Sequence, residues 1–136
     1  MFDKTKNDTL LLIGRAMLAA MFILSGWSKL GHFDGTAAYM SSAGVPGFLL
    51  PLVILTELGG GLAILFGFQT RLAAIALAGF TVVAALIFHS HLSDQGQYIN
   101  FMKNIAIAGG FLALASSGPG HYSVDARVRR NSLQPA

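Results

Sequence analysis

The sequence predicts an all-α integral membrane protein: a four-helix bundle with antiparallel up-down topology and both termini in the cytoplasm. Three observations support this. The 136 residues are 54% hydrophobic and 11% charged, whereas soluble domains carry about 25% charged residues. Four apolar stretches each approach the ~20 residues that cross a bilayer. Lys and Arg concentrate in alternate connections. We expect the whole chain, residues 1–136, to form a single transmembrane domain.

Composition also narrows the chemistry. The chain has no cysteine, which excludes disulfides, thiolate metal sites and cysteine-ligated iron–sulfur clusters. A redox role would therefore need a bound cofactor or a partner, because we identify no haem or flavin motif. The formal net charge is +3, but the basic residues are too few and too scattered for a nucleic-acid surface.

The first predicted span covers residues 9–30. Lys4 and Lys6 precede it and resemble the start of a signal peptide. Arg15 interrupts the apolar run, however, and three more spans follow. We therefore expect this segment to remain as a membrane helix.

The second and third spans are predicted at residues 47–68 and 72–88. A loop rich in Gly and Ser, residues 32–46, precedes the second span and is expected to be ordered or partly helical outside the hydrocarbon. The short sequence GFQTR joins the second and third spans. So short a connection predicts neighbouring antiparallel helices.

The fourth span is predicted at residues 99–115, after the polar loop 90–98. Lys103 and Asn104 interrupt its apolar sequence, so we expect it to be stable mainly within a bundle. The sequence GPGH then ends the helix, and residues 118–136 form a basic cytoplasmic tail.

The orientation follows from the distribution of Lys and Arg, which short cytoplasmic loops retain. One side of the four-span arrangement has only Lys29 and Lys103. The other side carries Lys4, Lys6, Arg71, Arg127, Arg129 and Arg130. Both termini are therefore predicted to lie inside.

Small residues recur at every fourth position in two spans. They are Gly59, Ala63 and Gly67 in the second span, and Gly109, Ala113 and Ser117 in the fourth. Such spacing lets helices approach closely in lipid. It predicts packing within the bundle or, equally, between two copies of the chain.

Arg15 and Glu57 are charged residues within spans, where an ionised group is costly. Arg15, Phe22 and Lys29 are spaced by seven and share one helix face. We expect Arg15 to reach Glu57 and form an ion pair, either structural or functional. Glu57 alternatively stays protonated and exchanges protons with a ligand, since desolvation favours the neutral carboxyl.

Polar residues are expected to gather at the outer face and line one vestibule: Lys29, His32, Asp34, His89, His91, Asn100, Lys103 and Asn104. His89 and His91 point to different faces at i, i+2, so no metal site is expected. Interfacial anchoring is the simpler interpretation for His32, His91 and Trp27. Lys103 and Asn104 are adjacent within a span, and one of them is expected to face the bundle interior.

Three segments together resemble the DoxX family of small bacterial inner-membrane proteins: GRAMLAAMFILSGWSKLGHFDGTAAYM, GVPGFLLPLVILTELGGGLAILFGFQTRLAA and FMKNIAIAGGFLALASSGPGHYSVD. The resemblance covers about residues 10–125 and implies a four-helix inner-membrane bundle. The polar positions of the family correspond here to Arg15, Lys29, Glu57, Arg71, Lys103 and Asn104. The family takes its name from a subunit of an archaeal quinone-linked oxidoreductase, which supplies an analogy for function.

Two functional hypotheses follow. In the first, the interior binds a quinone beside a proton path, and a partner dehydrogenase supplies electrons. The candidate ligand or proton-path residues are Arg15, Lys29, Glu57, His89, Lys103 and Asn104, and no catalytic residue is assigned. In the second, the chain is a non-enzymatic assembly subunit or a carrier for small hydrophobic compounds, and carriage would require a homo-oligomer.

Overall fold

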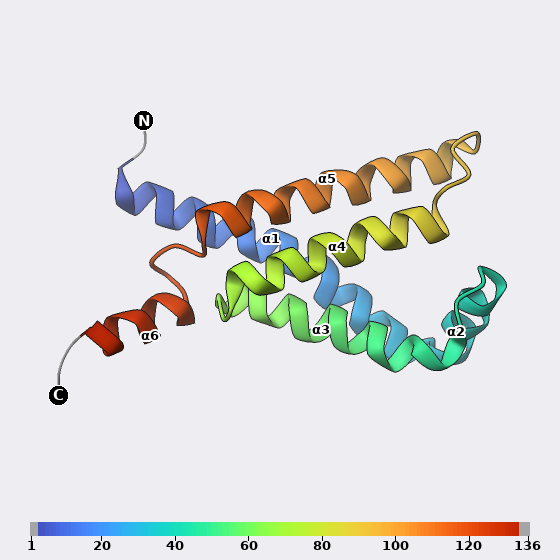
Figure 1. The fold of residues 1–136 in the computed structure, drawn as a ribbon, viewed down its shortest axis with the longest axis horizontal. Coiled ribbons are helices and arrows are strands. Elements are labelled where there is room, and N and C mark those ends of the chain that lie inside the picture. The colour runs from blue at the N-terminus through green and yellow to red at the C-terminus, as the bar shows by residue number, and fades with distance from the viewer. Residues whose placement is uncertain (1–2, 134–136) are drawn as a thin grey trace.

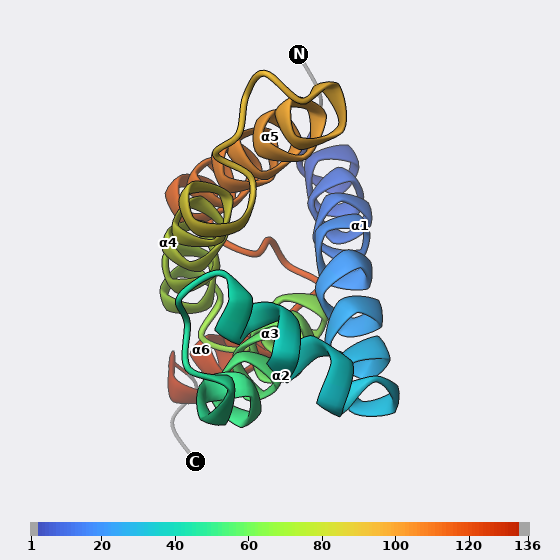
Figure 2. The same cartoon turned by 90° about the vertical axis from the view of Figure 1, so that its right-hand side faces the viewer.

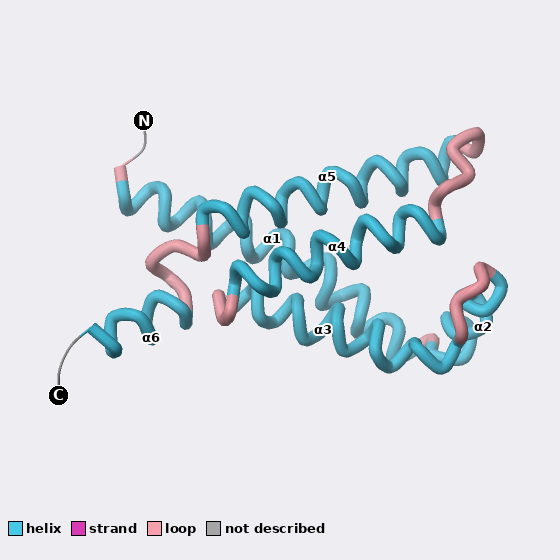
Figure 3. The backbone as a smooth tube through the Cα atoms, in the orientation of Figure 1, coloured by secondary structure: helices cyan, strands magenta, loops and turns pink. Residues whose placement is uncertain are grey.

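The computed structural model describes residues 3–133, which form helices and connecting loops and contain no strand. Four helices are long: α1 (Lys4–Gly31), α3 (Leu50–Phe66), α4 (Thr70–Phe88) and α5 (Gln95–Ser117). Three are short: α2 (Phe33–Ser42), the 3-10 helix η1 (Gly47–Leu49) and α6 (Val124–Leu133). The connecting loops lie mainly at the two ends of the long helices (Figure 3).

Four helical segments are long and apolar enough to cross a membrane. They are Lys4–Gly31, Gly47–Phe66, Thr70–Phe88 and Gln95–Ser117. Each contains most of a predicted span, and their ends lie within five residues of the predicted ends, with the largest difference at the start of the first span. The all-α class and the four apolar spans are therefore confirmed.

The long helices pack as two pairs, α1 with α3 and α4 with α5. The tight turn between α3 and α4 joins the pairs, while α1 and α5 touch only sparsely. Residues at both ends of the chain lie at one end of the molecule, and α2 lies at the other (Figures 1 and 2). The arrangement places an open interior between the two pairs rather than a uniformly packed core.

Glycines determine how closely α1, α3 and α4 approach. A Cβ atom at Gly26 would lie 2.7 Å from Leu58 Cγ, and one at Gly61 would lie 2.9 Å from Ile23 Cγ1. A Cβ atom at Gly60 would lie 2.9 Å from Leu77 Cδ2. A side chain at any of these positions would force the neighbouring side chain or helix to shift, so the glycines allow the close approach of the helices.

Within the described chain the predicted stripes pack inside the bundle only in part, and packing between two copies of the chain stays a prediction. Gly59 and Gly109 are exposed, and a Cβ atom at Gly109 would meet no packing partner within 4 Å in the described chain. Consecutive residues lie about 100° apart around a helix. The neighbouring Gly60 and Gly61 therefore take the packing role that the four-residue spacing assigned to Gly59.

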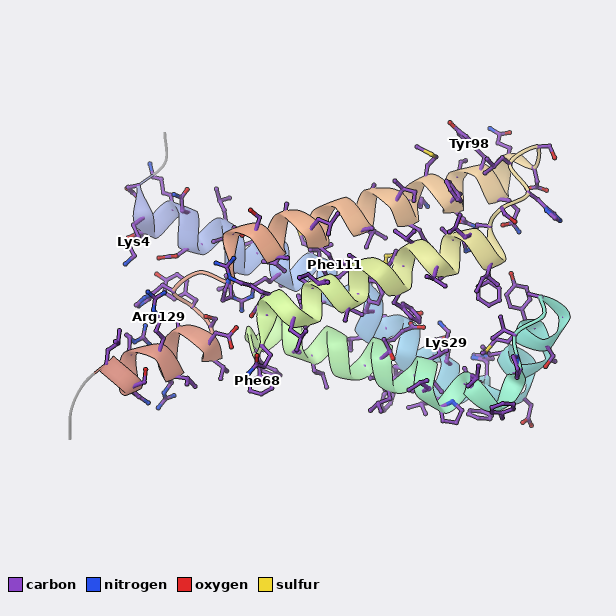
Figure 4. All side chains as sticks on the ribbon, viewed as in Figure 1. Lys4, Lys29, Phe68, Tyr98, Phe111 and Arg129 are labelled. Atoms are coloured by element: carbon purple, nitrogen blue, oxygen red, sulfur yellow. The ribbon has the colours of Figure 1, made fainter. Side chains whose placement is uncertain are left out.

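An aromatic contact occupies the middle of the bundle. The Phe22 and Phe111 rings meet edge to face, with centroids 5.4 Å apart. Both side chains are buried in a core that draws on α1, α3, α4 and α5. Through this contact α1 and α5, which otherwise touch sparsely, meet in the middle of the bundle. Phe111 is labelled in Figure 4.

The predicted basic tail contains a helix that the sequence reading missed. Ser123 Oγ accepts a hydrogen bond from Ala126 N at 3.1 Å and so begins α6. The signal was present as a capping serine followed by an acidic first turn at Asp125. The end of the predicted tail, residues 134–136, lies outside the described residues.

Candidate functional site: a cavity between two helix pairs

A cavity of about 600 Å³ lies between the two helix pairs, toward the end of the molecule that carries α2. Its wall is mostly apolar and includes Met21, Phe22, Leu52, Val53, Phe80 and Ile107. A few polar side chains also face it: Ser25, Lys29, Thr36, Thr56, Glu57, Thr81, His89 and Asn104. This combination is typical of sites for small, largely apolar ligands.

Lys29 and Glu57 form an ion pair on the cavity wall. Lys29 Nζ lies 2.8 Å from Glu57 Oε1 and donates to Ser25 Oγ at 2.7 Å. The Glu57 side chain is 4% exposed, while that of Lys29 is 27% exposed. The Lys29 side chain (labelled in Figure 4) is therefore the more exposed member of the pair. The ammonium group of Lys29 has three N–H donors, and two of them have Glu57 Oε1 and Ser25 Oγ as acceptors.

The predicted contact between Arg15 and Glu57 is wrong, because the register of α1 against α3 places them apart. Gly26 lies against Leu58, and Ile23 lies against Gly61. Since the two helices run in opposite directions (Figure 1), residue 15 faces the C-terminal end of α3. Lys29, four turns along α1 from Arg15, reaches the carboxylate instead.

Arg15 is 1% exposed and bonds to four backbone carbonyl oxygens. Its Nε donates to Ile64 O at 3.0 Å and its Nη2 to Leu65 O at 2.9 Å. Its Nη1 donates to Pro119 O at 2.7 Å and Tyr122 O at 2.8 Å. The last carbonyls of a helix lack partners within it. Arg15 therefore completes the end of α3 and ties the loop before α6 to it.

His89 and Asn104 face the cavity from the α4–α5 side. His89 Nδ1 lies 2.8 Å from Gln97 Oε1, and that oxygen only accepts, so Nδ1 donates and neutral His89 keeps Nε2 as an acceptor. Asn104 Nδ2 donates to Thr81 O at 3.4 Å. The cavity thus holds a cation on one wall and hydrogen-bonding groups on the opposite wall.

The eight-residue vestibule expected from the sequence forms only in part. Lys29, His89 and Asn104 line the cavity. The other five residues of the set are exposed and do not line it: His32, Asp34, His91, Asn100 and Lys103. On α5 the adjacent Lys103 and Asn104 differ, because the helical step of about 100° turns one outward and one inward.

The sequence did not predict several of the residues that line the cavity. Tyr39 of α2 and Phe88 of α4 stack at the cavity wall with ring centroids 5.5 Å apart. Their separation of 49 positions leaves no local sequence signal for this contact. Thr56 and Thr81 also line the cavity. Thr56 is next to Glu57 and Thr81 is a polar residue within the third span, and these positions could have indicated them from the sequence.

In the described residues 3–133, no group of three or more His, Cys, Asp or Glu side chains is placed to hold a metal ion. The polar groups of the cavity are instead an ammonium, a carboxylate, an imidazole, an amide and hydroxyls. Such groups bind and orient a ligand by hydrogen bonds and charge.

The chain was compared with protein families and with known proteins. The DoxX family model matches residues 10–90. The inner membrane protein YqjF of Escherichia coli (strain K12) is 52% identical over 122 residues, which cover 90% of this chain and 94% of YqjF. The inner membrane protein YphA of the same strain is 40% identical over 128 residues, covering 89% of this chain and 91% of YphA.

A more distant relative, "Putative oxidoreductase CatD" of Bacillus subtilis (strain 168), is 34% identical over 79 residues, or 58% of this chain and 57% of CatD. No solved structure matches the chain. The family model covers more than half of the chain, two inner membrane proteins match nearly all of it, and four helices can span a membrane. The chain therefore belongs to the DoxX family and is a multi-pass protein of the inner membrane.

Proposed function

We propose that the cavity between the helix pairs binds a quinone or a similar flat aromatic, and that the protein serves as the membrane subunit of an oxidoreductase complex. The observation that carries this proposal is the Lys29–Glu57 ion pair on the wall of an apolar cavity of about 600 Å³. The similarity to CatD, whose name assigns an oxidoreductase only provisionally, agrees with it.

Cavity size and lining support a ligand of this class. Small-molecule sites usually measure about 300–1,000 Å³ and combine apolar walls with a few polar groups. Phe22, Phe80 and Phe88 offer aromatic surface to a ring, and Lys29 offers an N–H to a carbonyl oxygen. His89 lies on the opposite helix pair and supplies a second hydrogen-bonding group.

In the ion pair Lys29 carries the proton, so its ammonium group would pass a proton to a reduced quinone oxygen, and Lys29 would regain one by way of the Glu57 carboxylate. Quinone reduction takes up protons together with electrons, and a charged pair beside the ring supplies a path for them. The sequence has no cysteine and therefore supplies neither a redox-active disulfide nor a cysteine-ligated iron–sulfur cluster. Electrons would come from a partner dehydrogenase that binds at the membrane surface.

We further propose that the four spans cross the inner membrane as an antiparallel up-down bundle with both termini in the cytoplasm. Arg71, Arg127, Arg129 and Arg130 lie near the end of the molecule that holds both chain ends, as do Lys4 and Lys6. Cytoplasmic ends of membrane proteins are enriched in Lys and Arg. Reporter enzymes fused after Ala136 should be active only as cytoplasmic reporters, and periplasmic activity would contradict this orientation.

Equilibrium binding of a short-chain ubiquinone analogue tests the cavity directly. Purified protein in nanodiscs should quench the analogue or shift its absorbance in a saturable way. Ala84 lines the cavity, whereas Leu86 on the same helix is exposed. We expect Ala84→Phe to abolish binding by filling the cavity and Leu86→Phe to leave binding unchanged.

The two variants also separate binding from indirect effects. Equal loss of binding in both variants, or saturable binding that survives Ala84→Phe, would exclude the cavity as the quinone site. If the wild-type protein binds neither ubiquinone nor menaquinone analogues, the quinone proposal fails. The second hypothesis, an assembly subunit or a carrier for other hydrophobic compounds, would then be favoured.

A further inference from the structure

A second hollow of about 520 Å³ lies between α1 and α5, at the end of the molecule away from the cavity. We call it the α1–α5 groove. Its α1 wall consists of Asn7, Leu10, Leu11, Gly14, Arg15 and Leu18. Its α5 wall consists of Gly110, Ala113, Leu114 and Ser117. The groove exists because α5 presents the small residues Gly110, Ala113 and Ser117 to α1, and the two helices make few contacts.

The groove is separate from the proposed quinone site. On α1, residues 7–18 line the groove and residues 21–29 line the cavity. On α5, residues 110–117 line the groove, while Asn104 and Ile107 line the cavity. The Phe22–Phe111 contact lies between the two sets of residues. The two hollows therefore occupy different halves of the bundle.

We infer that the α1–α5 groove binds one acyl chain of an anionic phospholipid, whose headgroup lies beside Lys4. The inference is independent of the quinone proposal and uses the proposed position of this end at the membrane surface. Its length supports an acyl chain. Eleven helical steps separate Asn7 from Leu18, or about 16 Å, and one leaflet contributes about 15 Å of hydrocarbon.

The charge at the open end of the groove supports an anionic headgroup. Lys4, Asn7, Leu11, Gly14 and Leu18 follow each other at helical spacings of three and four, so they form one stripe along α1. Lys4 is exposed and therefore extends the groove wall into the headgroup region. Basic side chains at this depth attract anionic lipids.

Among the described residues 3–133, neither Asp3 nor Asp8 lies within ion-pair distance of Lys4, and both carboxylates accept from backbone N–H groups instead. Asp3 Oδ1 accepts from Lys6 N at 2.8 Å, and Asp8 Oδ1 accepts from His121 N at 2.9 Å. The Arg15 guanidinium at the groove wall bonds to four carbonyl oxygens. Lys4 is thus the exposed charge on the stripe that lines the groove.

Native mass spectrometry of protein released from nanodiscs tests the inference. The nanodiscs would contain equal amounts of phosphatidylethanolamine and phosphatidylglycerol. We expect the wild-type chain to retain one phosphatidylglycerol in preference to phosphatidylethanolamine. Lys4→Gln should reduce that preference by about fivefold, whereas Lys103→Gln, an exposed lysine away from the groove, should leave it unchanged.

Filling the groove tests the acyl-chain site itself. A Cβ atom at Gly110 would lie 3.5 Å from Leu18 Cδ2, inside the groove, whereas Gly109 is exposed and does not line it. Gly110→Leu should remove the retained lipid, and the matched Gly109→Leu should keep it. Ala113→Leu provides a second groove variant, and circular dichroism checks that each variant remains helical.

Three results would overturn the inference. The first is wild-type protein that retains no lipid from the mixture. The second is unchanged lipid retention in both Gly110→Leu and Ala113→Leu. The third is a wild-type dimer that dissociates in these variants, which would assign the groove to a second copy of the chain.

Discussion

Arg15, Arg71 and Asp125 lie toward the end of the bundle that holds both chain ends, and they bond to backbone atoms. Lys29 and Glu57, on the cavity wall, bond to side chains instead. Arg15 bonds to four carbonyl oxygens. Arg71 Nη1 donates to Ala115 O and Ser116 O, each at 2.8 Å. Asp125 accepts from the N–H groups of Gln69 at 2.7 Å and Thr70 at 2.9 Å.

These three side chains complete helix ends, where backbone groups lack intrahelical partners. In contrast, Lys29 and Glu57 pair beside a cavity, and no helix end depends on them. The comparison separates two meanings of a charge within an apolar segment. A charge held by backbone at a helix end stabilises the fold, whereas a pair that faces a cavity is available to a ligand.

Arg15→Ala should produce the largest loss of stability. The substitution removes the Arg15 donor from four carbonyl groups, of which Ile64 O keeps a hydrogen bond from Gly67 N at 3.3 Å. A buried polar group left unpaired costs about 1–3 kcal/mol. We expect destabilisation of at least about 3 kcal/mol, measured by chemical denaturation in detergent with helicity as the readout. Arg15→Lys keeps the positive charge but loses the planar guanidinium group, so its stability should lie between that of the wild type and that of Arg15→Ala. Unchanged stability in Arg15→Ala would contradict the structural role.

Gly26→Ala should be the next most damaging change. The new Cβ atom would lie 2.7 Å from Leu58 Cγ, so α1 and α3 must separate or Leu58 must move, at a cost of about 1–3 kcal/mol. Gly14→Ala on the same helix is the matched control, since a Cβ atom there has open space in the described chain. It should be neutral or slightly stabilising, because alanine favours helices over glycine. Equal thermal stability of the two variants would refute this packing.

Asp125→Ala should have a moderate effect on stability and none on quinone binding. The Asp125 carboxylate caps the N-terminus of α4 from the distant α6, and loss of an N-terminal cap costs about 0.5–2 kcal/mol. Thermal unfolding followed by circular dichroism measures the effect. Asp34→Ala, an exposed aspartate in the first turn of α2, serves as the comparison. An equal loss in both variants would show that Asp125 has no special role.

Lys29→Met combined with Glu57→Gln should have the smallest effect on stability and a clear effect on ligand affinity, because the double change leaves no unpaired charge in place of the buried pair. Methionine keeps the apolar stem but removes the N–H donors, and a hydrogen bond from a charged donor contributes about 1.5–3 kcal/mol. We expect the affinity for a ubiquinone analogue to fall by at least about tenfold. Lys103→Met, on the exposed face of α5, should bind normally. Unchanged binding in the double variant would show that the ion pair serves the fold.

Much of the architecture is predictable because membrane insertion imposes simple rules on sequence. Apolar stretches of span length identify the four long helices, since hydrocarbon requires backbone hydrogen bonds within each segment. The spacing of Arg15, Phe22 and Lys29 correctly assigns one face of α1 to the interior, where Arg15, Ala19, Phe22 and Gly26 are buried. The family resemblance is confirmed by the match to residues 10–90.

The partners of the charged residues, in contrast, depend on the tertiary structure. Arg15 and Glu57 are both buried, as the cost of charge in lipid implies, but the register between α1 and α3 decides that Lys29 takes the carboxylate. Register depends on which glycines allow close approach, and Gly61 was not distinguishable from Gly59 by the four-residue spacing. The α6 capping of α4 likewise joins residues more than fifty positions apart.

The sequence by itself therefore determined that this chain lies in the membrane, how many segments cross it and which residues are costly there, because these properties depend on local composition and periodicity. Only the tertiary structure decided which costly residues complete the fold and which face a cavity. That distinction depends on contacts between helices, and such contacts follow from packing geometry that no single segment contains.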